Sequence, residues 1–143
     1  DIACCFELFE HMFDPLIFLK KIHKILKKNG LLYFSTLNGK GFDIDLLREN
    51  SSAIYPPYHL NFFNPYSIKK ILKISGFRYI RVETPGKLDL DIVEKNSDLI
   101  KSRTLKFFFK NTIKNFSEND KKKFQNKIIK EKLSSHMIVV ATK

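Results

Sequence analysis

Two short apolar runs near the start of the chain have the pattern of strands, and an amphipathic helix separates them. The runs are residues 1–6 and Leu31–Phe34. Unbroken apolar runs are typical of strands in a parallel sheet covered on both faces. Between them, Asp14-Pro15 supplies a helix cap and a proline at the first helical position, and Asn29-Gly30 ends the helix. The pattern therefore predicts a βαβ unit with two parallel strands.

The rest of the chain divides into a polar connection, a capped helix, an alternating strand, a helical stretch and a last strand. These segments are, in order, residues 35–63, 64–76, 77–84, 88–133 and 137–141. Within the polar connection, Asp43 is expected to cap a short helix. We interpret residues 88–133 as a helical insertion between the last two strands rather than a separate domain. The predicted fold class is therefore α/β.

Composition fits one globular domain. The chain has 143 residues, of which 43% are hydrophobic and 14 are Phe. No apolar run approaches the roughly 20 residues that span a bilayer, so no membrane partner is expected. Cys4 and Cys5 are adjacent and cannot form an ordinary disulfide, because they point to opposite faces of a strand. We expect them to be buried thiols in a reducing compartment, which indicates a cytoplasmic protein.

The net charge of +11 raises the question of nucleic-acid binding. Residues 1–86 carry 12 basic and 8 acidic side chains, and residues 87–143 carry 14 and 7, so neither half holds most of the excess. Lys outnumbers Arg 22 to 4, whereas specific recognition of nucleic acids favours Arg. A nucleic-acid partner is therefore not expected.

Polar side chains that could carry chemistry follow the first two predicted strands. In open α/β sheets, ligands bind beyond the carboxyl ends of the strands. After the first strand come Glu7, Glu10 and His11; after the second come Thr36, Asn38 and the glycines of the segment 39–41. The glycines would let the backbone approach a ligand closely. Each group alone is also compatible with a structural role, as a helix cap or a turn.

The segment Phe6–Pro15 resembles the stretch after the fourth strand of class I S-adenosylmethionine (SAM) methyltransferases. The resemblance is strongest to ubiquinone-biosynthesis-like O-methyltransferases and the methyltransferase 23/11 group, which carry E-x-x-E-H-hydrophobic-x-D-P there. Leu26–Phe34, Pro57–Phe63 and His136–Thr142 are similar to later segments of the same fold. The resemblance implies the C-terminal half of a Rossmann-like doubly wound sheet, containing strands four, five, six and an antiparallel seventh strand.

The same resemblance implies site residues. It places Phe6 and Glu7 against the methionine and adenosine parts of SAM, and Glu10 and His11 beside the acceptor. His59, in the loop after the second predicted strand, would cover the acceptor side. A histidine suits the removal of a proton from an acceptor hydroxyl, so we expect His59, slightly ahead of His11, to act as base or orienter. Glu10 would hold that geometry or a bound cation; no dedicated metal site is predicted.

The chain departs from the family in one large respect. It has no G-x-G-x-G loop after a strand and no acid to hold the ribose, the features that grip SAM. We therefore expect residues 1–143 to form a partial methyltransferase domain whose N-terminal SAM-binding half lies before residue 1. Alone, the chain is expected to be inactive and to self-associate through the sheet edge where the missing strands belong.

Two other functions stay open. The chain could be a non-catalytic remnant that binds a partner chain through its sheet edge. A basic nucleic-acid-binding module is the third reading, and it predicts binding that falls steeply with salt. For the leading hypothesis, the expected partner is a small-molecule acceptor and the expected reaction is O-methylation.

Overall fold

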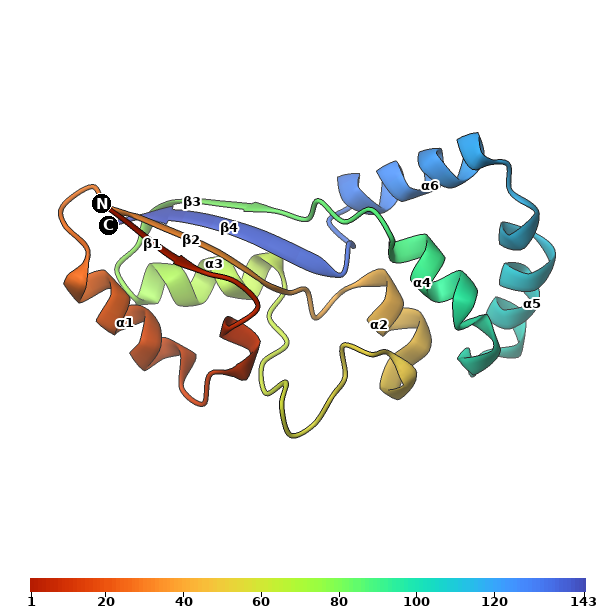
Figure 1. Cartoon of the computed structure of the whole chain (residues 1–143), viewed down its shortest axis with the longest axis horizontal. Helices are drawn as coiled ribbons and strands as arrows, with labels where there is room; N and C mark the ends of the chain where they lie inside the picture. The colour runs from red at the N-terminus through yellow and green to blue at the C-terminus, as the bar shows by residue number, and fades with distance from the viewer.

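The computed structural model describes all 143 residues and consists of a four-stranded sheet, helices packed on it, and helices gathered at one end (Figure 1). The strands are β1 (Ile2–Cys5), β2 (Leu31–Leu37), β3 (Arg78–Glu83) and β4 (His136–Thr142). The helices are α1 (Pro15–Ile25), α2 (Phe42–Leu47), α3 (Pro65–Ile74), α4 (Asp89–Lys95), α5 (Arg103–Asn111) and α6 (Glu118–Lys130).

The sheet has the strand order β1-β2-β4-β3. β1 and β2 are parallel, with Ile2 opposite Leu31, and β4 is antiparallel to both of its neighbours. The βαβ unit, the α/β fold class and the antiparallel last strand are therefore confirmed. β2 runs three residues beyond the predicted Phe34 because β4 pairs with it as far as Leu37.

The main core lies between the sheet and two helices, α1 and α3, which Figure 1 shows on the same side of the sheet. Leu19 of α1 and Leu72 of α3 are fully buried against Phe34 of β2 and Val139 of β4. Residues of β2 alternate between buried and half-buried, because only one face of the sheet is fully covered. The prediction that both faces are covered was wrong.

β1 is the edge strand, so it is more exposed than predicted. Ile2 is 64% exposed and the Cys4 side chain is exposed, while Cys5 is half-buried. The prediction of two buried thiols was therefore wrong for Cys4 and correct only in part for Cys5. Burial, with the Cys4 thiol as a smaller cause, raises the pKa of Cys5 to about 11.

The N-terminal caps of α1 and α3 follow the sequence signals, whereas the N-cap of α2 does not. The Asp14 carboxylate accepts the backbone N–H of Ile17, and Asn64 forms a capping box with Ser67 at the start of α3. Asp43 does not cap α2 as predicted: the N-cap is Gly41, and Asp43 lies inside the first turn, where its carboxylate is buried.

Another helical residue, His23 of α1, is less exposed than its polar helix face predicted. It is half-buried, with its ring edge against Phe77 and its atoms over Gly76. A side chain at Gly76 would collide with this ring, and the positive φ of Gly76 ends α3.

Residues 88–133 form the predicted helical insertion, called the helical lobe below, and it extends from one end of the sheet (Figure 1). It has a small apolar core of its own, in which Phe109 and Ile113 pack with Leu47 of α2. The lobe joins the sheet through a buried polar cluster in which the Ser135 hydroxyl lies 2.6 Å from Asp43 and 2.7 Å from Asp89.

Hydrogen bonds from three neighbours concentrate on one carboxylate of this cluster. Asp89 accepts from the Ser135 backbone N–H at 2.7 Å, from the Gln125 amide at 2.5 Å and from the Ser134 hydroxyl. Burial opposes its ionisation, but these hydrogen bonds outweigh burial and lower the pKa of Asp89.

Candidate functional site

The predicted site residues gather at the carboxyl ends of β1 and β2. Glu7 lies two residues after the end of β1, and Glu10 and His11 belong to a 3-10 turn, Phe9–His11, that begins two residues later. His59 reaches the same place from the long connection after β2. The ligand atoms of Glu10, His11 and His59 all lie within 4.8 Å of one another. The structure therefore brings together the three residues predicted to face the acceptor.

Glu7 is held by two side chains from other strands. Its carboxylate accepts the Ser35 hydroxyl at 2.6 Å and lies 3.2 Å from the imidazole Nε2 of His136. The hydrogen bond with His136 is the largest cause that lowers the pKa of Glu7 from 4.5 to about 2. The same bond raises the pKa of His136. Glu7 is therefore an anion paired with an imidazole that favours its charged form.

Glu10 is the buried carboxylate of the site. Its side chain is 1% exposed, and one of its oxygens accepts the Thr36 hydroxyl at 2.9 Å. Phe9, in the same turn, is fully buried between Phe34 and Phe63, and this anchors the turn to the core. The carboxylate is thus fixed in position with few protein donors around it.

The two histidines have the same hydrogen-bond arrangement. Nδ1 of His11 lies 2.8 Å from the carbonyl oxygen of Tyr58, and Nδ1 of His59 lies 2.7 Å from that of Ala53. A carbonyl oxygen only accepts, so Nδ1 carries the proton in each ring and Nε2 of the neutral ring keeps a free lone pair. The ring centroids are 4.9 Å apart. Each Nε2 is therefore available as a base or as a ligand.

Backbone contacts hold the His59 loop against the 3-10 turn. The backbone N–H groups of Leu60 and Asn61 donate to the Glu10 carbonyl at 2.8 and 3.0 Å, and the Asn61 amide donates to the Met12 carbonyl at 2.6 Å. These bonds join segments about fifty residues apart in the chain. They explain why His59 arrives beside His11.

The polar turn after β2 has a structural role, which was one of the two roles that its sequence allowed. The space that a Gly39 side chain would need is occupied by the Phe62 carbonyl, and the Asn38 amide donates to the carbonyls of Lys132 and Ser134. Thr36 contacts Glu10 and so supports the site indirectly. The expectation that these glycines admit a ligand was wrong, because protein backbone fills the space.

Sequence reasoning missed His136 and Ser35. Ser35 lies in β2, one residue beyond the predicted end of that strand, and His136 is the first residue of β4. One signal could have found His136. An antiparallel strand begins at the edge where its parallel neighbours end, so the first residue of β4 lies beside the exit of β1. The Glu7–His136 pair follows from that topology.

The residues at the exit of β1 fit SAM in part. The Phe6 side chain is 60% exposed and packs edge-on against Tyr33, while Glu7 is about half exposed. Both are accessible to a ligand at the end of the strand. The residues of this chain include no glycine-rich loop that would bring backbone N–H groups to a nucleotide beside them.

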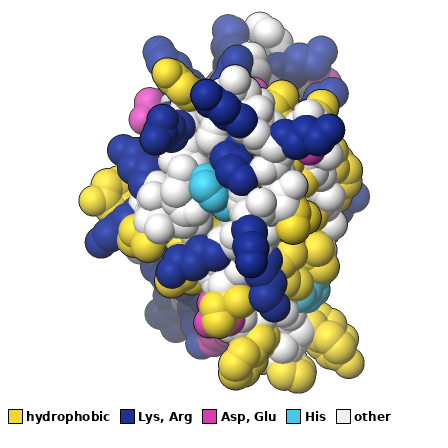
Figure 2. All heavy atoms as spheres, turned by 90° about the vertical axis from the view of Figure 1, so that its left-hand side faces the viewer, with side chains coloured by type: hydrophobic (Ala, Val, Ile, Leu, Met, Phe, Trp, Pro, Cys, Tyr) yellow, Lys and Arg dark blue, Asp and Glu magenta, His cyan; other side chains and the backbone are white.

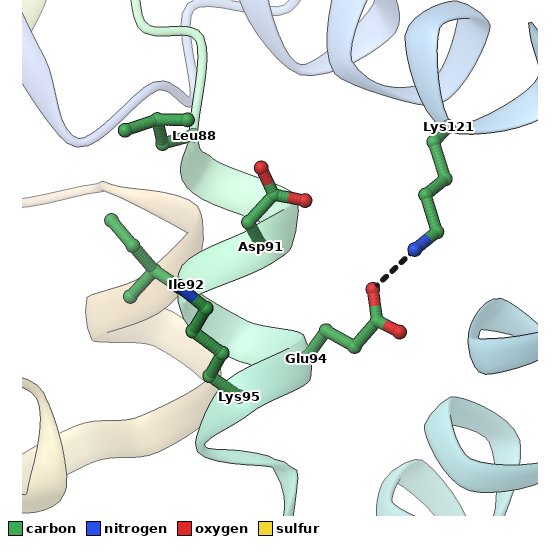
Figure 3. A pocket seen from close by; sticks show the side chains of 6 residues that line it. All are labelled: Leu88, Asp91, Ile92, Glu94, Lys95 and Lys121. Atoms are coloured by element: carbon green, nitrogen blue, oxygen red, sulfur yellow. Dashed lines mark hydrogen bonds and ion pairs between the residues drawn. The ribbon is translucent and has the colours of Figure 1, made fainter. Parts of the chain in front are cut away.

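A hollow of about 520 Å³ lies elsewhere, between α4 and α6 in the helical lobe (Figure 3). Its lining includes the ion pair in which Lys121 lies 2.8 Å from Glu94. None of the predicted site residues lines it. The mixed charges and the distance from the strand ends set it apart from the candidate site.

Comparison with sequence families gives a match for residues 1–82, more than half of the chain, to the methyltransferase-domain family Methyltransf_23. Curated relatives match over a short stretch. The ubiquinone biosynthesis O-methyltransferase of Histophilus somni is 45% identical over 38 residues, and that of Actinobacillus pleuropneumoniae is 42% identical over 38 residues. The match covers 27% of this chain and 16% of each relative.

Solved structures with the same fold include two methyltransferases. Phosphoethanolamine N-methyltransferase 2 of Haemonchus contortus, solved with S-adenosyl-L-methionine, has a TM-score of 0.59 and 19% identity over 99% of this chain and 33% of its own. A possible histamine N-methyltransferase of Thermotoga maritima has a TM-score of 0.58 and 13% identity, covering 100% of this chain and 56% of its own. At these identities the likeness shows the fold.

Proposed function

Because the chain belongs to the Methyltransf_23 family of SAM-dependent methyltransferases, we propose that it is the C-terminal portion of an enzyme that O-methylates a small polar acceptor. The chain spans 16% of the length of the curated relatives it matches, which are O-methyltransferases. The site geometry supports removal of a proton from an acceptor hydroxyl by a histidine. The observation that carries this proposal is that His11 and His59 each commit Nδ1 to a backbone carbonyl, and that a ligand atom of each lies within 4.8 Å of the buried Glu10 carboxylate.

In this proposal the chain's own residues orient the acceptor and take its proton. SAM, when bound, supplies a methyl group on a good leaving group, so alignment of the acceptor oxygen provides most of the acceleration. His59 Nε2 accepts the hydroxyl proton, since Nδ1 is already committed to the Ala53 carbonyl. Glu10, beside the two rings, holds that geometry. Phe6 and Glu7 form the cofactor-facing wall.

The test is turnover of His59→Ala and His11→Ala in the full-length protein, with SAM affinity measured in parallel by calorimetry. Loss of the general base lowers kcat about a hundredfold or more and leaves SAM affinity unchanged. His23→Gln is the matched control, because His23 packs on Phe77 away from the strand ends. Near-normal turnover of both alanine variants would show that the histidines are structural.

A second role for the same residues is favoured by one observation. One carboxylate and two imidazoles with ligand atoms within 4.8 Å suit a first-row divalent cation such as Mn²⁺ or Zn²⁺. Backbone carbonyls orient both rings in the manner usual for metal ligands. Calorimetric titration with either ion, compared between the wild type and His59→Ala, separates this role from a base that works without metal. Equal heats from the two proteins would exclude the cation.

The chain alone is proposed to be inactive. It has no glycine-rich loop to bring its backbone close to SAM, and Phe6 and Glu7 provide only one wall. Titration of SAM into the 143-residue chain is expected to show no measurable heat, whereas micromolar binding would contradict this proposal.

A further inference from the structure

The charge of this chain is concentrated in two helices of the helical lobe. Residues 101–132, which contain α5 and α6, carry eleven Lys and Arg and three Asp and Glu, a net +8 of the chain's +11. Lys and Arg also occur at the end of the molecule that carries the termini, but Figure 2 shows them spread there between hydrophobic and uncharged side chains.

One face of α6 consists largely of lysine. Lys122, Lys123, Lys127 and Lys130 are all exposed. At 3.6 residues per turn, Lys123, Lys127 and Lys130 lie on the side opposite the buried Gln125 and Ile128, and Lys122 lies at the flank of that side. None of the four takes part in an ion pair of the structure. Like charges three and four residues apart destabilise a helix, so this face favours an anionic surface that would neutralise it.

α5 adds exposed apolar side chains to the same lobe. Phe107 is 70% exposed, Phe108 43% and Leu105 40%, whereas Phe109 faces inward against Phe42. Arg103 lies one turn before Phe107 on the same face of the helix. The side chains of Phe and Leu carry no hydrogen-bonding groups. Their transfer from water into an apolar phase is therefore favourable, whereas contact with a phosphate backbone gives no such gain.

We propose that α5 and α6 form a docking surface for an anionic lipid bilayer. Lysines attract the acidic head groups, while Phe107, on the side of α5 away from the inward-facing Phe109, and its neighbour Phe108 enter the boundary between head groups and acyl chains. No helix is long and apolar enough to cross a membrane, so the contact is peripheral. A second copy is excluded as the occupant because it would bring the same +8 charge against this surface.

This surface lies outside the candidate active site, and the proposal does not depend on the proposed reaction. It replaces our earlier expectation of no membrane partner, which rested only on the absence of a long apolar run.

Sedimentation with vesicles tests the proposal on the full 143-residue chain. Binding is expected to vesicles of mixed phosphatidylcholine and phosphatidylserine, to weaken with salt, and to be absent with phosphatidylcholine alone. Replacing the four α6 lysines with Gln should reduce partitioning at least about a hundredfold. The matched control replaces four exposed lysines on or next to α1, which are Lys20, Lys21, Lys24 and Lys28.

Three results would overturn the proposal: no binding to anionic vesicles, equal binding to neutral ones, or equal loss in both lysine quartets. Displacement of the protein from vesicles by a single-stranded oligonucleotide at equal phosphate concentration would instead identify a nucleic-acid surface.

A second measurement does not depend on how well the quartet variants fold. The chain contains no Trp, so Phe107→Trp at an exposed position introduces a single fluorescent reporter. Anionic vesicles should shift its emission to the blue, and quenchers attached to acyl chains should dim it. An unchanged spectrum on addition of vesicles would show that α5 does not enter the lipid.

Discussion

The sheet and the helical lobe are stabilised in different ways. The sheet has a continuous apolar core of twelve buried residues shared by strands and two helices. The lobe has six, one of which, Leu47, comes from α2 outside it. The junction between them is polar, with the Ser135 hydroxyl between Asp43 and Asp89. The candidate active site rests on the large core, whereas the lysine-rich surface rests on the small one.

This difference indicates that the helical lobe can unfold locally more easily than the sheet. A small core with exposed neighbours opens at a lower free energy than a large one does. The placement of the lobe depends on a few buried hydrogen bonds that only certain side chains can make. The following predictions test whether the two regions are distinct units and what joins them.

The largest effect is expected in the two cores. Phe34→Ala removes a fully buried ring that contacts Phe9, and should lower the free energy of unfolding by about 3–5 kcal/mol. Phe109→Ala, the same change in the lobe, should cost about 2 kcal/mol, because a small core next to solvent collapses more easily. Urea denaturation measures both values. Hydrogen exchange should show loss of protection confined to the lobe in Phe109→Ala; equal loss across the sheet would mean one cooperative unit.

The junction comes next. Asp89→Ala leaves the Ser135 N–H and the Gln125 amide without their acceptor, which should cost about 3 kcal/mol or slightly less. The exposed Asp45, paired only with Arg48 on the surface, provides the control, and Asp45→Ala should leave stability nearly unchanged. If both variants melt alike, the buried cluster does not hold the lobe in place.

A smaller effect concerns the Glu7–His136 pair at the site. The lowered pKa of Glu7, about 2, gives stability that is present above pH 4.5 and lost as the pH falls toward 2. The raised pKa of His136 gives stability that is present below pH 6.5 and lost as the pH rises through the folded value. The pair therefore contributes most between about pH 4.5 and 6.5, and less than about 1 kcal/mol because both side chains are half exposed.

The measurement is the Tm of the wild type and of His136→Gln across this pH range. Their difference should be bell-shaped, with its maximum in that window. A difference that stays constant with pH would mean that the two side chains do not interact in solution.

The smallest effect is expected at the free edge of the sheet. β1 has a single neighbour, and Ile2 is exposed on it, so a second copy could pair there. Ile2→Lys should lower the fraction of dimer severalfold in sedimentation velocity. Tyr79→Lys on the opposite edge is the control, since the irregular register of β3 between Arg78 and Arg81 already disfavours pairing. A wild type that stays monomeric at every concentration would contradict the prediction.

Most of the fold could be predicted because its signals are local. Asp14-Pro15 and Asn64-Pro65 start α1 and α3 as predicted, and α3 ends just before Gly76 as expected. α1 ends at Ile25, four residues before the predicted Asn29. Burial was harder to predict, because the exposure of Ile2 and Cys4 depends on which strand occupies the edge. No pattern within the strand itself carries that information.

The sequence was enough to predict which residues form the candidate site, but it did not predict the contacts that those residues make. Glu10, His11 and His59 were named from the sequence, and the fold brings them together. The Glu7–His136 pair was missed because it crosses three strands, and the Asp43 cluster because its partner, Ser135, lies 92 residues away. Contacts of this range follow from topology, which short motifs do not record.

The hydrogen bonds that hold the His59 loop against the 3-10 turn at Glu10 have a consequence for protein engineering. The bonds that fix it run from the backbone N–H groups of Leu60 and Asn61 and from the Asn61 amide. The neighbouring Tyr55 and Tyr58 side chains point into solvent and take no part in them. A library that randomises those two tyrosines would therefore vary the mouth of the site while His59 keeps its place, which makes this loop a natural starting point for altering acceptor preference by directed evolution.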